Sequence, residues 1–176
     1  FDQYVDTDAV LAGLSEDAAA LLTENIDALH TRHPSDWFFR HDAAFMEQYM
    51  AERRAADIAF VRAALDYYFD SSRVPISRTD GTARWASDEM RAFAAAYSVT
   101  VGAVRTDGDR AYADAVLHGN DSTYGRLLPA AAFTLELARM ADGRWKLVRI
   151  RTAADENGFF ALVDAAERYW ALQGWD

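Results

Sequence analysis

The hydrophobic pattern of this chain changes its period once, at Tyr97, and this change constrains the fold more than any other feature. Before Tyr97, apolar residues recur every three or four positions, as they do from Ala9 to Leu29, which is typical of helices. After Tyr97, apolar and polar residues alternate, and the Asp-Gly pairs at residues 107–108 and 142–143 are typical of tight hairpin turns. A run of helices followed by antiparallel strands predicts an α+β fold.

The first helical stretch covers residues 9–29 and ends before Pro34. Proline cannot extend a helix, and it disfavours helical geometry at His33, the residue before it. Within this stretch, the acidic run Ser15-Glu16-Asp17 has the composition of a new helix start.

A second helical stretch, capped by Ser35 or Asp36, contains no Gly or Pro up to about Phe69. We therefore expect one long helix here, or two nearly continuous ones. Residues 71–83 are predicted to form a loop with room for one short strand. Ser87, which is followed by two acids, is expected to cap a short helix that precedes the first strand.

Four strands in meander order and a closing helix are expected in the second half. The predicted strands cover residues 97–106, 110–119, 131–140 and 144–152, and the helix covers residues 159–173. A turn at residues 142–143 places Glu136 opposite Arg149. The same register sets apolar side chains opposite each other, in the pairs Leu135 with Ile150 and Leu137 with Val148. The apolar and polar faces agree across this hairpin, which supports the register.

Residues 52–152 resemble the nuclear-transport-factor-2-like superfamily, the cystatin-like cone fold that ketosteroid isomerase also has. The features that carry the resemblance are a helix ending in Val61-Arg-Ala-Ala-Leu-Asp-Tyr-Tyr-Phe69, a short helix before the first long strand, and paired hairpins. The last of these hairpins ends in Ala141-Asp-Gly-Arg-Trp-Lys-Leu-Val-Arg-Ile150. The opening Phe1-Asp-Gln-Tyr-Val-Asp6 is similar to the start of uncharacterised envelope-associated bacterial proteins.

The resemblance implies a curved four-stranded antiparallel sheet that encloses, with its helices, a conical and often apolar pocket. It divides the chain into an N-terminal helical extension, residues 1–50, packed on a cone-fold domain, residues 51–176, that includes the C-terminal helix. Members of the superfamily include isomerases, dehydratases and epoxide hydrolases, and also non-catalytic binding or assembly domains, so the fold alone does not choose a function. No catalytic residue is carried over from the isomerase.

The composition excludes several classes of function. The chain has a net charge of −10, which argues against a protein that grips nucleic acid. It contains no cysteine, so disulfides and thiolate chemistry are excluded. No apolar run reaches the roughly 18 residues of a membrane-spanning helix, and no dinucleotide fingerprint is present. We therefore expect no cofactor, no nucleic-acid partner and no transmembrane segment in this chain.

The first residue is Phe1 rather than Met, so we expect a processed product or a piece of a longer chain. A removed signal peptide or membrane anchor fits this start and favours a periplasmic or secreted protein. A cytoplasmic fragment is the alternative.

One face of the predicted sheet carries the candidate catalytic groups Tyr112, Asp114 and His118, with Glu136 on a neighbouring strand. A phenol, a carboxylate and an imidazole are the groups that move protons, and a partly dry pocket shifts their pKa values toward neutrality. The plainer interpretation is a solvated face on which Glu136 and Arg149 form a cross-strand ion pair of about 0.2–1 kcal/mol.

The same face supplies the candidate ligand-binding residues Tyr112, Arg149 and Arg151. Its two arginines suit a small anionic or polar ligand.

The only metal-like cluster is His30 and His33 with Asp36, His41 and Asp42 nearby. Two imidazoles at i and i+3 can share a helix face. The spacing matches no established metal motif, however, and the helix breaks directly after the second histidine, so we expect no metal site.

The closing helix is rich in aromatic residues, with Phe159, Phe160, Tyr169 and Trp170 inside it, Trp175 just beyond it, and Trp145 on the sheet as an expected contact. Such a helix either seals one end of the domain or docks on a second copy or another protein.

These features favour a non-catalytic bacterial domain at the cell envelope that binds a small apolar ligand or a protein partner. The alternative is a cofactor-free enzyme of the isomerase or dehydratase type that uses Asp114 with Tyr112 or His118 as acid and base.

Overall fold

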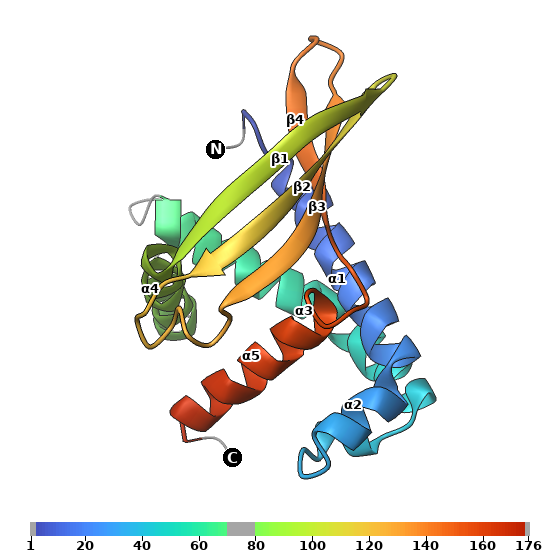
Figure 1. Cartoon of the computed structure of the whole chain (residues 1–176), viewed down its shortest axis with the longest axis vertical. Helices are drawn as coiled ribbons and strands as arrows, with labels where there is room; N and C mark the ends of the chain where they lie inside the picture. The colour runs from blue at the N-terminus through green and yellow to red at the C-terminus, as the bar shows by residue number, and fades with distance from the viewer. Residues whose placement is uncertain (1–2, 70–79, 175–176) are drawn as a thin grey trace.

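The computed structural model describes residues 3–69 and 80–174 (Figure 1). Its elements are α1 (Thr7–Glu24), α2 (Ile26–Arg32), the 3₁₀ turn η1 (Phe38–Arg40), α3 (Ala43–Phe69), α4 (Asp80–Ala96), β1 (Tyr97–Asp107), β2 (Arg110–Gly119), β3 (Ala130–Arg139), β4 (Trp145–Thr152) and α5 (Phe159–Leu172). The strands form one antiparallel sheet in the order β1-β2-β3-β4. The predicted α+β fold, with N-terminal helices, a meander sheet and a C-terminal helix, is confirmed.

The first helix is continuous, so the prediction of a new helix start at Ser15 is wrong. α1 begins where Asp6 Oδ1 accepts a hydrogen bond from the Ala9 amide at 3.1 Å, and it runs to Glu24. The break comes at Asn25, whose side-chain amide donates to the Leu21 carbonyl at 2.8 Å. That bond satisfies one of the carbonyls that a helix end leaves open.

The segment after Pro34 contains two caps rather than one. Asp36 Oδ1 accepts from the Phe38 amide at 2.7 Å and begins η1, so it does not cap the long helix. Asp42 takes that role, because its Oδ1 accepts from the Phe45 amide at 2.9 Å. Of the two alternatives for this stretch, one long helix is confirmed: α3 runs without interruption to Phe69.

The helix before the first strand is longer than predicted. α4 begins at Asp80, so Ser87 lies inside the helix, where it is fully buried, and does not cap it. Residues 80–83, which were predicted to belong to a loop, are therefore helical. The rest of that predicted loop, with its short strand, lies outside the described residues.

The sheet register matches the prediction for Glu136 opposite Arg149 and Leu135 opposite Ile150. It differs one step later, where a β-bulge sets Leu137 opposite Leu147 instead of Val148. Both hairpins turn at a glycine with positive φ, +58° at Gly108 and +81° at Gly143, as tight turns of this kind require.

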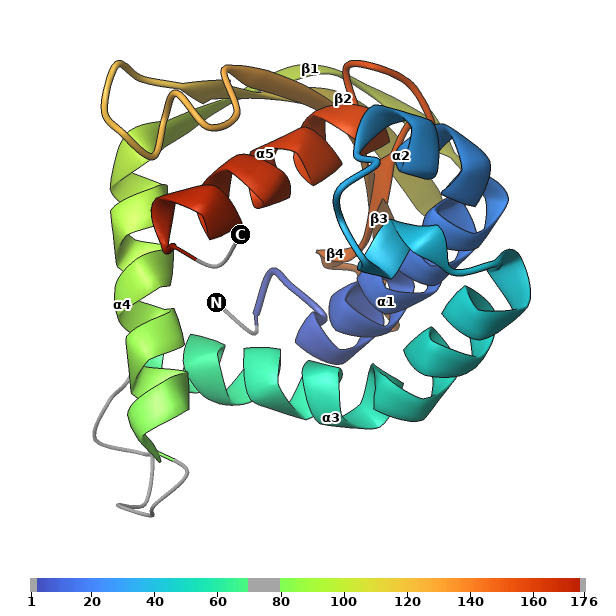
Figure 2. The same cartoon turned by 90° about the horizontal axis from the view of Figure 1, so that it is seen from below.

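The helices lie on one side of the sheet. Figure 2 shows α3, α4 and the pair α1 and α2 around three sides of the molecule, with the sheet on the fourth and α5 beneath it. The N-terminal segment joins the sheet at its β4 edge, because Val5 bridges Leu147 in parallel. The opposite edge, β1, is open, and its residues Val99, Val101 and Val104 are exposed.

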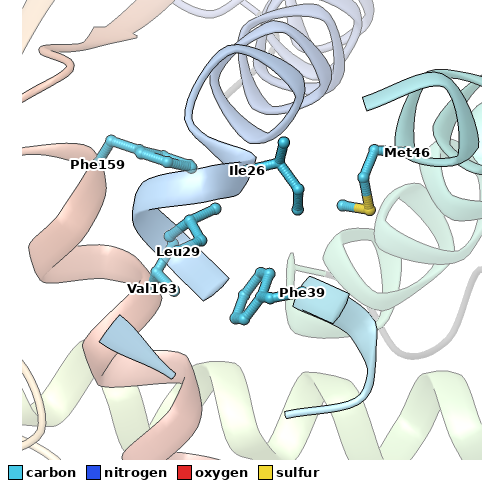
Figure 3. Packing of buried hydrophobic residues seen from close by; sticks show 6 residues of the cluster. All are labelled: Ile26, Leu29, Phe39, Met46, Phe159 and Val163. Carbon is cyan, nitrogen blue, oxygen red and sulfur yellow. The ribbon is translucent and has the colours of Figure 1, made fainter. Parts of the chain in front are cut away.

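The main core cluster ties the two ends of the chain together (Figure 3). It consists of six buried side chains from α2, η1, α3 and α5: Ile26, Leu29, Phe39, Met46, Phe159 and Val163. The expected boundary between residues 50 and 51 falls inside α3, and the cluster draws on residues from both sides of it.

Candidate functional site

Among the predicted strand-face residues, Glu136 is the most buried, at 8% exposure. It is held by two arginines: its Oε1 accepts from Arg110 Nη1 at 2.9 Å, and its Oε2 accepts from Arg151 Nη2 at 3.0 Å. A carboxylate with both oxygens bonded to guanidinium groups is a structural ion-pair centre. The guanidinium of Arg151 is therefore already paired with Glu136.

Arg149 lies opposite Glu136 but bonds elsewhere, so the expected cross-strand pair does not form. Its guanidinium donates to Asp17 of α1, and its Nη1 lies 3.8 Å from Glu16. Gly13 makes this approach possible, because a Cβ at that position would sit 3.2 Å from Arg149 Cγ. The ion pairs of Arg149 with Asp17 and Glu16 join β4 to α1.

Asp114 lies on the open part of the sheet. Its side chain is 61% exposed and pairs with Arg105 at 2.8 Å. The hydrogen bonds from Arg105 lower the pKa of the Asp114 carboxyl, which keeps it ionised at neutral pH. Tyr112 is half-buried and paired with Glu136 in the register. His118, which is exposed, lies at the far end of β2. The structure therefore gathers Tyr112, Glu136 and Arg151, and leaves His118 apart.

The two histidines near Pro34 lie in different surroundings. His30 is exposed in the last turn of α2. His33 Nε2 lies 3.0 Å from Asp164 Oδ1. Arg32 donates to both oxygens of the same carboxylate, at 2.7 and 2.6 Å, and these bonds lower the pKa of Asp164. No group of three potential metal-binding side chains occurs within residues 3–69 and 80–174.

The aromatic residues of α5 divide between the core and the surface. Phe159 is buried in the core cluster, and the Tyr169 hydroxyl donates to Glu89 Oε2 at 2.9 Å. Burial, followed by this bond to Glu89, raises the pKa of Tyr169. Trp170 is 41% exposed. Trp175 lies outside the described residues.

The exposed face of α5 forms one wall of a pocket with a volume of about 930 Å³. The opposite wall is the segment from Ser35 to Phe39, and Leu22 and Tyr49 reach the pocket from α1 and α3. Such a volume lies within the roughly 300–1,000 Å³ range of small-molecule sites. We call this site the α5 pocket.

Aromatic rings dominate the lining of the α5 pocket. Trp37, Phe38, Phe39, Tyr49 and Trp170 all contribute to it. The Phe38 and Tyr49 rings meet edge to face with centroids 5.3 Å apart, which fixes their orientation. Trp37 is 62% exposed, an unusual state for so large an apolar side chain.

Two carboxyl groups, Asp36 and Glu167, lie in this aromatic lining. Glu167 is within hydrogen-bonding reach of Asp36. Burial, then the bond to Asp36 and the charges of Asp36 and Asp164, raise the pKa of Glu167 to about 7. Two adjacent carboxyls in a partly dry site share a proton because both cannot easily be ionised. The pair can therefore exchange one proton near neutral pH.

Glu167, Trp37 and Tyr49 were not predicted to belong to a site, and Asp36 was expected only as a cap and as part of the metal-like cluster. A signal for Glu167 was present. Val163, Ala166 and Trp170 recur at helical spacing, and Glu167 lies on the same face of α5 as these apolar residues. An acid within an apolar stripe is a candidate for a shifted pKa.

Comparison with protein-family models, with curated proteins and with solved structures gave no match to this chain. In the described ranges, no helix is both long and apolar enough to cross a membrane.

Proposed function

We propose that this protein binds a small, mainly apolar ligand in the α5 pocket without transforming it. The observation that carries the proposal is the combination of a pocket of about 930 Å³ with a lining of five aromatic side chains. Two of these side chains, Trp37 and Trp170, are exposed, and exposed apolar patches often mark binding sites. Burying such rings against a ligand releases about 25 cal/mol per Å² of apolar surface.

The enzyme alternative with Asp114 has less support. An acid–base catalyst needs a pKa near the working pH, whereas Asp114 is paired with Arg105 and its pKa is lowered. Docking of a protein partner on α5 has the exposed Trp170 in its favour, but the lining surrounds a volume of small-molecule size. An envelope location in a bacterium stays a prediction from the sequence.

The order of α3, α4 and the meander β1–β4 supports the further proposal that the fold is of the nuclear-transport-factor-2-like cone type. An experimental structure tests this. The proposal expects the sheet and α3 to superpose on members of that superfamily, and a different path of the strands around α3 contradicts it.

The binding proposal can be tested with the neutral fluorescent probe N-phenyl-1-naphthylamine. We expect saturable binding with increased emission, and an affinity at least about fivefold lower in Trp37→Ala, because the lost ring removes roughly 1 kcal/mol or more of apolar contact. Trp85→Ala, which removes the same side chain from α4 outside the pocket, is the matched control. Absence of saturable binding, or equal losses in both variants, contradicts the proposal.

A further inference from the structure

The aromatic lining of the α5 pocket suits a particular kind of ligand. The faces of tryptophan, tyrosine and phenylalanine rings attract cations, and several rings around one site form the cages that recognise ammonium groups. Trp37 and Trp170 come from two different parts of the chain, the segment after Pro34 and α5, and both line the pocket. The Tyr49 ring lines it from α3, but the Arg53 guanidinium already lies over this ring, 5.6 Å from its centroid. The two tryptophans therefore supply ring surface on more than one side of a ligand.

In the part of the chain that the structure describes, the two carboxyls of this pocket have no basic partner. Several acids elsewhere in the molecule form ion pairs with arginines, as Glu136 does with Arg110 and Arg151. Across residues 3–69 and 80–174, no Lys or Arg forms an ion pair with Asp36 or Glu167. Arg40, the nearest base along the chain from Asp36, donates instead to the carbonyls of Pro34 and Ser35.

We propose that the ligand of the α5 pocket is a hydrophobic organic cation, with its ammonium group beside Asp36 and Glu167 and its apolar body against the aromatic rings. This inference rests on the proposed function, because it names the ligand class of the same pocket. Carboxylates supply the opposite charge, the rings supply a face that tolerates a poorly hydrated cation, and the net charge of −10 favours the approach of cations to the molecule as a whole.

The proposal implies a dependence of binding on pH. The pKa of Glu167 is about 7, so its carboxyl is mostly protonated at about pH 6 and mostly ionised at about pH 8. Because an ammonium group prefers the ionised form, the affinity for a permanently charged ligand rises up to about tenfold over this interval.

Other groups near Glu167 also bear on this dependence. Asp36 faces it from the segment after Pro34, Asp164 lies one turn earlier on α5, and Tyr49 lines the pocket from α3. From α2, Arg32 and His33 act through Asp164, which binds both of them. The affinity of Glu167→Gln therefore has to be measured at every pH together with that of the wild type. Only the part of the pH dependence that is absent in this variant is due to Glu167.

The experiment is isothermal titration calorimetry of the whole protein with benzyltrimethylammonium, whose charge does not titrate. Its neutral counterpart of nearly the same shape is 2-methyl-1-phenyl-2-propanol. At about pH 8 we expect the cation to bind roughly five- to tenfold more tightly than the alcohol. Asp36→Asn and Glu167→Gln should each remove most of this preference, and Glu167→Gln should also flatten the pH dependence. Asp107→Asn, at the tip of the β1–β2 hairpin, removes one charge far from the pocket and should leave the preference unchanged.

The outcomes separate the two proposals. Equal affinity for the cation and the alcohol overturns the inference of a cationic ligand and leaves the proposed apolar binding site standing. A preference that survives in both pocket variants, or that Asp107→Asn removes equally, overturns the inference too, because the attraction then comes from the overall charge. If neither compound binds, both proposals fail. Circular dichroism of each variant establishes that it is folded.

Discussion

At the scale of single residues, several acids of this protein have an arginine partner. These pairs hold elements together, as Arg149 does when it joins β4 to Asp17 of α1. Asp36 and Glu167 instead bond to each other. Like charges side by side cost folding energy, so this arrangement works against stability when both carboxyls are ionised.

Glu167→Gln should therefore stabilise the protein at alkaline pH. The folded-state pKa of Glu167, about 7, lies above the roughly 4.3 of a free glutamate. Between these two values the unfolded chain releases a proton that the folded chain retains, so the contribution of Glu167 to stability is lost as pH rises through this interval. Glutamine does not titrate and avoids the loss.

We compare the free energy of unfolding of Glu167→Gln with that of the wild type at about pH 8 and at about pH 4.5. The difference should favour the variant by about 1–2 kcal/mol more at pH 8 than at pH 4.5. This value is smaller than the full pKa shift implies because Glu167 is half-exposed. Urea denaturation at both pH values measures it. Glu47→Gln, which removes a charge from the exposed surface of α3, is the control. A difference between variant and wild type that does not change with pH would count against a proton shared in the pocket.

At the scale of elements, the connection between β2 and β3 depends on close backbone contacts. A Cβ on Gly119 would lie 1.9 Å from the Gly125 carbonyl oxygen and 2.7 Å from that of Leu128. Both obstacles are backbone atoms, which cannot swing aside as a side chain can. The loop is also anchored to β1, because the Tyr97 hydroxyl donates to the Tyr124 carbonyl at 2.6 Å.

Gly119→Ala should destabilise the protein by about 2–3 kcal/mol, because the overpacked methyl group forces the backbone apart. Gly81→Ala is the matched control. Nothing lies within 4 Å of a Cβ at Gly81, and alanine in a helix is favoured over glycine by roughly 0.5–1 kcal/mol. Thermal unfolding followed by circular dichroism tests both. Equal melting temperatures for the two variants contradict this account of the loop.

The elements that could be predicted are those whose signal is local. The period change at Tyr97 and the turns at Gly108 and Gly143 located the strands, because side-chain alternation and positive φ are properties of neighbouring residues. The start of α4 was missed, since Asp80-Gly81 has the composition of a turn and Ser87 that of a cap. In the structure Ser87 lies fully buried inside α4, and a sequence window does not show which side chains the fold will bury.

The candidate site, too, could be predicted only where the signal is local. Alternation along β2 and β3 correctly placed Tyr112 and Glu136 on one face. It did not show whether a partner would neutralise the Glu136 carboxylate. The α5 pocket forms between residues from the two ends of the chain, Asp36 and Glu167 among them. Only the position of Glu167 in an apolar stripe was visible beforehand.

At the scale of the whole molecule, the N-terminal helices and α5 belong to one core. Leu29 of α2 is fully buried and packs in a cluster with Met46 of α3 and Val163 of α5. This arrangement sets the two walls of the α5 pocket at a fixed separation, because the segment after Pro34 and α5 are both attached to the same cluster.

Leu29→Ala should cost about 2–5 kcal/mol, the usual range for a leucine removed from a packed core. The loss should lower the stability of the entire chain in a single unfolding transition. Leu14→Ala, at a position with 36% exposure on α1, should cost about 1 kcal/mol or less. Calorimetry tests this prediction. A common core is contradicted if residues 51–176 of the variant unfold at the wild-type temperature while the rest of the chain unfolds at a lower one.

If the α5 pocket binds a small molecule, the tryptophan side chains report on the binding directly. Two-dimensional ¹⁵N–¹H NMR of the indole groups, assigned with single Trp→Phe variants, follows each of them during titration with benzyltrimethylammonium and with 2-methyl-1-phenyl-2-propanol. We predict saturable shifts for Trp37 and Trp170, which line the pocket, and none for Trp85 in α4 or Trp145 at the start of β4. Saturable shifts of Trp85 or Trp145, or no saturable shift at Trp37 and Trp170 with either compound, would contradict binding in the α5 pocket.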